Sequence, residues 1–128
     1  MRVVVSFRNI EFNDRQPYYQ QIFKHLRRQI LLGEVKDGDI MPSRRELAKQ
    51  TGVSLNTAQK AYRLMAKEGY IYTKGNTGST IMLPPKLKEM VSEEMTRGLV
   101  QRFVDDAKQN QLSYKKVIGL LDELWDDE

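Results

Sequence analysis

The chain has 128 residues, which is enough for one ordinary domain or for one small domain with an appendage. Hydrophobic residues make up 40% and charged residues 30% of it, and no apolar run approaches the ~20 residues needed to cross a bilayer, which excludes a membrane protein. With no cysteine, disulfides and thiolate metal sites are excluded; residues 1–7 lack the long apolar stretch of a signal peptide, so we expect a cytoplasmic location.

Positive charge is concentrated in the first two-thirds of the chain. Residues 1–85 contain 14 lysines and arginines against 7 acidic residues, whereas residues 86–128 contain 7 against 10. A basic excess suits a polyanion such as nucleic acid, although an excess of this size is also typical of an ordinary solvated surface. The two parts of the chain are therefore expected to have different roles.

The first elements are a short extended segment and a helix. Residues 1–16 are treated as an N-terminal extension, and the apolar residues within positions 1–9 are assigned no function. From Pro17 onward, apolar residues recur at spacings of three and four up to Ile30. Because proline suits a helix start and Gly33 a helix stop, the pattern predicts a helix over residues 18–32.

A helix-turn-helix follows. Ser43 and Glu46 form a predicted capping box, in which each side chain bonds the backbone amide of the other, and Gly52 can close that helix in the left-handed conformation. Ser54 can then cap a third helix, and the tight turn between the two helices is the mark of a helix-turn-helix. The third helix is predicted to have a core face and an opposite polar face. The core face consists of Ala58, Ala61, Tyr62 and Met65, and the polar face consists of Asn56, Gln59, Lys60 and Arg63.

The residues after Gly69 change from helical to extended periodicity. Residues 70–73 and 80–83 are rich in strand formers, and the glycines and asparagine of 75–78 accept the positive φ of a tight hairpin. A hairpin directly after such a helix is a wing, so residues 17–83 are predicted to be a winged helix-turn-helix domain. The prolines at 84 and 85 mark its boundary.

Residues 84–128 predict two amphipathic helices, the second capped by Ser113. Two helices alone cannot bury their apolar faces, and each large apolar side chain left in water forgoes about 1.5–3 kcal/mol. We therefore predict a mainly α fold with a small β-hairpin (α+β), in which this two-helix tail dimerises the chain. The predicted dimer interface consists of Leu87, Met90, Val91, Met95, Leu99, Phe103, Tyr114, Val117, Ile118, Leu121, Leu124 and Trp125.

Between the first helix and the wing, a series of short motifs occurs in a fixed order, at residues 17–22, 33–39, 42–43, 45–48, 52–54, 56–57 and 68–69. With these motifs, residues Pro17–Ile81 resemble the DNA-binding domain of the GntR family of bacterial transcription regulators. The short tail is similar to that of the YtrA-like branch, in which such a helical pair dimerises the protein. The resemblance implies a homodimeric repressor bound to double-stranded DNA at a palindromic operator, with a transporter operon as one expected target.

The same resemblance implies which residues touch DNA. At two places this chain departs from the family: Leu55 stands where many relatives have an arginine, and Asn76 and Thr77 occupy a wing tip that is usually basic. The implied contacts fall on Arg45, Ser54, Leu55, Asn56, Thr57, Gln59, Gly75, Asn76 and Gly78.

The residue types support these positions independently of the family. The side-chain amides of Asn56 and Gln59 can pair bidentately with adenine, and the capped helix starts at Ser43 and Ser54 place backbone amides where a phosphate can sit. The alternative for each of these residues is that it is an ordinary polar residue on a solvated surface and does not contact DNA. Candidate phosphate contacts are Arg44, Arg45, Lys49, Lys60, Arg63 and Lys74.

Other functions have less support in the sequence. His25 is the only histidine, so neither a nucleophile–base pair nor a zinc site can be built around it, and we expect no catalytic residue, metal or cofactor. Two alternatives stay open. One is a ligand-sensing regulator with a small hydrophobic effector near Phe103 and Trp125 at the dimer seam, and the other is a winged-helix module that binds protein.

Overall fold

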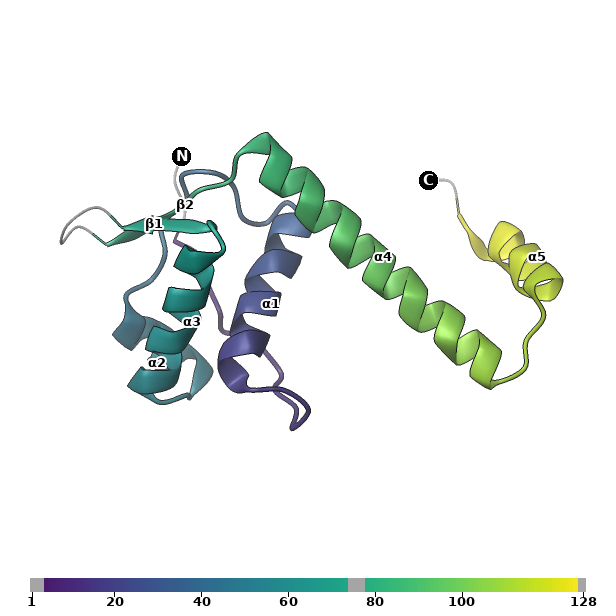
Figure 1. The fold of residues 1–128 in the computed structure, drawn as a ribbon, viewed down its shortest axis with the longest axis horizontal. Coiled ribbons are helices and arrows are strands. Elements are labelled where there is room, and N and C mark those ends of the chain that lie inside the picture. The colour runs from purple at the N-terminus through teal and green to yellow at the C-terminus, as the bar shows by residue number, and fades with distance from the viewer. Residues whose placement is uncertain (1–3, 74–77, 127–128) are drawn as a thin grey trace. The chain divides into compact units, whose positions relative to one another are not determined.

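A computed structural model describes residues 4–73 and 78–126 of the chain. Its elements confirm the expected fold class, mainly helical with one small antiparallel hairpin (Figure 1). The chain divides into two compact units, residues 1–92 and 93–128. In chain order the elements are α1 (Tyr18–Leu31), α2 (Arg44–Thr51), α3 (Leu55–Lys67), β1 (Ile71–Thr73), β2 (Ser79–Ile81), α4 (Pro85–Gln109) and α5 (Tyr114–Leu124).

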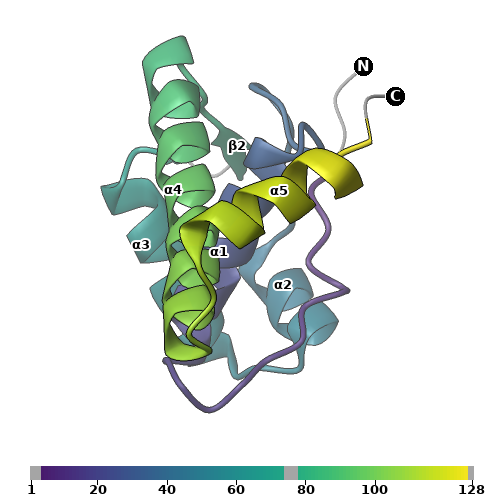
Figure 2. The same ribbon diagram turned by 90° about the vertical axis from the view of Figure 1, so that its right-hand side faces the viewer.

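The core of the first unit lies between three helices. Helix α3 packs against both α1 and α2 and is drawn between them in Figure 1; in the turned view of Figure 2, α1 is drawn in front of it. The apolar face predicted for the third helix is buried as expected, and Tyr62 is its largest buried side chain. Facing residues from the other two helices are Ile22, Leu26, Ile30 and Leu47.

Helix α1 begins after Pro17 and ends before Gly33, the two residues that predict its start and stop. Pro17 occupies the position before the first helical residue with a φ of −56°, and its carbonyl accepts the amides of Gln20 and Gln21. Gly33 follows the last turn with a φ of +75°, a left-handed conformation that glycine adopts without steric cost. The predicted end at Leu32 is one residue beyond the observed end.

The wing is part of a wider set of extended segments. Strands β1 and β2 pair antiparallel with Tyr72 opposite Thr80. On the far side of β2, Ile40 forms an antiparallel bridge to Thr80, and Val4 forms a parallel bridge to Ile40. Backbone amides hold this arrangement, with the amide of Met41 donating to the Ser79 carbonyl at 3.0 Å. The segment before α2 therefore supports the base of the wing.

Residues 1–16 are the predicted N-terminal extension, and part of its described portion, residues 4–16, packs into the first unit. Val5 and Phe7 are buried in the core of the first unit, and the Val5 amide donates to the Ile40 carbonyl at 2.8 Å. The Phe7 ring also lies 5.9 Å from the ring of His25 on α1. Alternate side chains of an extended segment point to opposite faces, so Val5 and Phe7 enter the core while Ser6 and Arg8 remain exposed.

The first turns of α4 belong to the winged unit, which extends to residue 92. Val91 was expected in the dimer interface, but its side chain is completely buried within its own chain. A residue that is already covered has no apolar surface left to offer a partner. Val91 is therefore a core residue, and its helical spacing could not distinguish these two kinds of burial.

The second unit contains the rest of α4 and α5. Ser113 caps α5 as predicted, its hydroxyl accepting the Lys116 amide at 3.1 Å. Gln111 adopts a φ of +58° in the connection between the helices. No residue of α5 is buried within the chain, although the helix is rich in leucine. Large exposed apolar residues of the second unit are Leu99, Val100, Phe103, Leu112, Tyr114, Ile118, Leu120, Leu121, Leu124 and Trp125.

Replacing the buried ring near the N-terminus tests whether that segment belongs to the domain. Phe7→Ala should lower the free energy of unfolding by about 3–5 kcal/mol, since it removes a fully buried ring and leaves a cavity. Denaturant unfolding followed by circular dichroism measures this change. Val4→Ala is the matched control because Val4 is largely exposed, and equal effects of the two substitutions would show that Phe7 is not a core residue.

His25 makes the stability of the first unit depend on pH. Burial lowers the pKa of its imidazole below the ordinary 6.5, an effect that Glu34 opposes and Arg28 reinforces. The unfolded chain then binds the proton more readily than the folded one, so this contribution is present above pH 6.5 and lost as pH falls below it. When pH is lowered from about 7.5 to about 5.5, the midpoint of thermal unfolding should fall less for His25→Gln than for the wild type. Equal losses would remove His25 as the cause.

Candidate nucleic-acid interface

The turn between α2 and α3 is built by two local devices. Gly52 ends α2 with a φ of +77°, and its amide donates to the Ala48 carbonyl at 2.8 Å. Two residues later, the Ser54 hydroxyl accepts the Thr57 amide at 3.1 Å and so caps α3. Both features were predicted from the sequence. They fix where α3 begins and leave its first turn exposed.

The first turn of α3 presents polar atoms and one apolar side chain. Ser54 and Asn56 are exposed, and Leu55 is 42% exposed. Thr57 is half-buried, and its hydroxyl lies 3.0 Å from that of Ser54. Thr57 therefore supports the cap, whereas the side chains of Leu55 and Asn56 are available to a ligand.

The remaining predicted contact residues of α3 lie on its outer side. Lys60 and Arg63 are exposed, and Gln59 is half-exposed. They lie opposite the face through which α3 packs on α1 and α2. One continuous helix thus carries an amide group and two cationic groups on its open face.

The first turn of α2 is also as predicted, except for one hydrogen bond. The Ser43 hydroxyl accepts the Glu46 amide at 3.0 Å, which is the first half of the capping box. The second half is not made: the Glu46 carboxylate accepts from Arg8 and Gln50 rather than from the Ser43 amide. Arg45 is exposed beside this cap.

Arg44 has a structural contact that was not predicted. Its guanidinium lies 4.7 Å from the ring centroid of Tyr62, over the aromatic face. The Tyr62 hydroxyl donates a hydrogen bond to the Pro42 carbonyl. Burial raises the pKa of Tyr62, an effect that Arg44 partly opposes, so the phenol keeps its proton and remains a donor. Tyr62 therefore joins α3 to the residues that precede α2.

Part of the predicted wing contact can be placed. Lys74, Gly75 and Asn76 lie outside the described residues. Gly78 starts the return of the hairpin with a φ of +89° and is exposed. At the last strand pair before the hairpin loop, the hydroxyls of Thr73 and Ser79 lie 2.6 Å apart.

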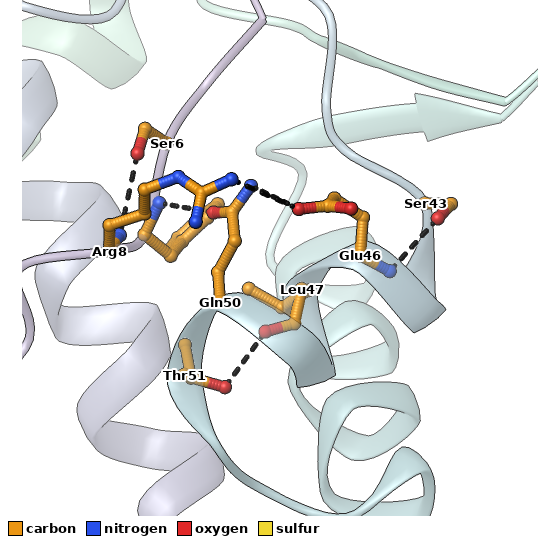
Figure 3. Close-up of polar contacts among 8 residues, drawn as sticks. Ser6, Arg8, Ser43, Glu46, Leu47, Gln50 and Thr51 are labelled. Carbon is orange, nitrogen blue, oxygen red and sulfur yellow. Dashed lines mark hydrogen bonds and ion pairs between the residues drawn. The ribbon is translucent and has the colours of Figure 1, made fainter.

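The sequence reasoning missed a contact between the N-terminal segment and α2. The Phe7 amide donates to Gln50 Oε1 at 2.8 Å, and Arg8 Nη2 lies 3.4 Å from Glu46 Oε2 (Figure 3). The alternation that buries Val5 and Phe7 was the available signal. It could indicate that Arg8 faces outward, but not that it would meet α2.

These features together define a winged helix-turn-helix DNA-binding domain: two capped helices joined by a glycine turn, followed by a β-hairpin. Within the described ranges, no three histidine or acidic side chains gather closely enough to hold a metal ion. None of the described helices is both long and apolar enough to span a bilayer.

Comparison with known proteins agrees with this class. The model of the bacterial regulatory proteins of the gntR family matches residues 18–81, half of the chain, and the chain belongs to this family. The branch expected from the sequence is supported by YtrA from Sulfolobus acidocaldarius, described as a GntR-family transcription factor. Its structure is 31% identical, with a TM-score of 0.56 over 78% of this chain and 99% of that one.

Two further relatives match nearly their whole length. A GntR family transcriptional regulator from Listeria monocytogenes is 26% identical, with a TM-score of 0.76 over 88% of this chain and 99% of that one. The uncharacterized HTH-type transcriptional regulator YhcF of Bacillus subtilis is 29% identical over 84% of this chain and 89% of its own. Other curated relatives are much longer, and the chain spans 13% of one and 38% of another. All of these relatives carry the description of a transcription regulator, repressor or transcription factor.

Proposed function

We propose that the chain is a homodimeric transcription repressor that reads a palindromic operator with two copies of α3, in the cytoplasm where bacterial DNA lies. A transporter operon is a candidate target, as expected for the YtrA-like branch. The observation that carries the proposal is the open polar face of α3. Its apolar face is fixed in the core, so Asn56, Gln59 and Lys60 project from a rigid element.

The proposed division of labour follows the chemistry of these side chains. Side-chain amides at positions 56 and 59 read base edges in the major groove, and Leu55 packs against a thymine methyl group. The cations of Arg45, Lys60 and Arg63 contact phosphates, which position the protein without specifying sequence. The capped starts of α2 and α3 add backbone amides that attract phosphate.

The proposed dimer uses the apolar residues of the second unit. Phe103 and Trp125 are 49% and 73% exposed in the single chain, and several leucines of α5 are also exposed. Burial of such residues against a second copy recovers about 1.5–3 kcal/mol for each fully covered side chain. Two copies would place two recognition helices in successive major grooves of the operator.

Substitutions on α3 test how it faces DNA. Sequences bound by the protein are first selected from a random duplex pool, and affinities are then measured at several salt concentrations. Gln59→Ala should relax the preference at one or two base pairs, because it removes a base-reading amide. Lys60→Ala should weaken all sequences about equally and reduce the salt slope by about 1, because it removes a phosphate contact.

Lys108→Ala is the control for this experiment, since it removes an exposed lysine from the second unit. If Gln59→Ala and Lys60→Ala behaved alike, the proposed facing of α3 would be wrong. If wild-type affinity for every duplex were weak and insensitive to salt, the proposal of a DNA-binding function would fail.

A charge placed on α5 tests the dimer. The double substitution Ile118→Asp and Leu121→Asp should shift the protein from dimer to monomer in sedimentation velocity, because two carboxylates would enter the proposed apolar interface. Binding to the palindromic site should fall at least about tenfold, while the winged unit keeps its helical circular dichroism. Lys116→Asp, an exposed charge reversal on the same helix, is the control. An unchanged dimer in the double variant would contradict the proposed interface.

A further inference from the structure

The segment that precedes α1 is held against α2 by side chains of α2 itself. Gln50 accepts the Phe7 amide through Oε1 at 2.8 Å and donates to Glu46 Oε2 through Nε2 at 3.1 Å. Arg8 Nη2 reaches the same Glu46 oxygen at 3.4 Å. Figure 3 shows the Arg8, Gln50 and Glu46 side chains converging above α2. We call these three residues the Arg8 network.

Glu46 lies at a position of α2 where a negative charge would weaken the binding of DNA. It lies in the first turn of α2, between the Ser43 cap and Gln50, and directly follows the exposed Arg45. Its side chain is still 39% exposed, so the carboxylate is not withdrawn from the surface. A free carboxylate here would repel the phosphates that Arg45 and the helix start attract.

We propose that Arg8 is a positioning residue for DNA binding: it neutralises Glu46 and, together with Gln50, holds the carboxylate on the side of α2 that faces the N-terminal segment. The first turn of α2 then presents Arg45 and the Ser43 cap to phosphate without an opposing charge. This inference rests on the proposed DNA-binding function and assigns a positioning role in it to the segment that precedes α1.

A purely stabilising role does not account for the arrangement. The Arg8 side chain is 64% exposed, and ion pairs between exposed side chains contribute little to folding. The N-terminal segment is already anchored by the buried Val5 and Phe7 and by the Phe7–Gln50 hydrogen bond. The ion pair is therefore not needed to keep the segment in place, and its main effect is on the charge of the surface around α2.

A double-mutant cycle on the full chain tests the proposal. Affinity for a labelled mixed-sequence duplex of about 30 base pairs is measured for wild type, Arg8→Ala, Glu46→Gln and the double variant, because phosphate contacts do not depend on sequence. Arg8→Ala should weaken binding about three- to tenfold at low salt, and the defect should shrink as salt screens the uncovered carboxylate. Glu46→Gln should bind at least as tightly as wild type, and adding Arg8→Ala to it should change little.

Two further variants separate charge from structure. Arg8→Lys keeps the positive charge and should retain most of the affinity. Arg97→Ala breaks an exposed arginine–glutamate pair of the second unit, with Glu93 at 2.7 Å, and should leave affinity unchanged. Thermal midpoints of all variants should agree closely with that of wild type, so that a loss of affinity cannot be ascribed to unfolding.

The outcomes distinguish this inference from the function on which it rests. If wild type shows no salt-dependent DNA binding, the proposed function fails. If wild type binds but Arg8→Ala behaves like Arg97→Ala, the function stands and the role of Arg8 is overturned. If Arg8→Ala weakens binding equally whether Glu46 is present or has been replaced by glutamine, Arg8 contacts phosphate directly and compensation of Glu46 is wrong.

Discussion

Burial of the apolar face of α3 is the constraint on which the rest of the structure depends. Ala58, Ala61, Tyr62 and Met65 recur at helical spacing and are all buried, on a helix that packs against α1 and α2. The period of an α-helix leaves no freedom about where the other residues point, so fixing this face in the core also fixes Gln59, Lys60 and Arg63 on the outside. Packing therefore orients the polar face that we propose reads DNA.

The sequence predicted elements whose signals are local. The glycine after α2, the serine caps of α2, α3 and α5, and the buried face of α3 all follow from a few neighbouring residues, and the structure contains each of them. The paired strands of the wing also have a local signal, since residues 70–73 and 80–83 are rich in strand formers. The candidate contacts on α2 and α3 are outward-facing for the same reason, since a helix with a known core face has a known open face.

What the sequence did not predict depends on contacts between distant residues. Phe7 enters the core and its amide bonds to Gln50, 43 positions away, so no local pattern distinguishes this segment from a loose extension. Glu46 has the correct spacing for a capping box, but Arg8 and Gln50 compete for its carboxylate. Val91 has the same helical spacing as the exposed tail residues and yet is buried. Helical spacing identifies the apolar face of a helix, but it does not show whether that face packs against the same chain or against a partner.

The hydrogen bond from Tyr62 to the Pro42 carbonyl has a consequence for the thermodynamics of association. It joins the middle of α3 to the residue before the Ser43 cap, and Arg44 covers the same ring. These contacts thus hold the two helices that we propose meet bases and phosphates in one arrangement within the folded chain. Little conformational entropy then remains to be lost when DNA arrives, so affinity would depend mainly on contacts and released counterions rather than on rearrangement of the protein.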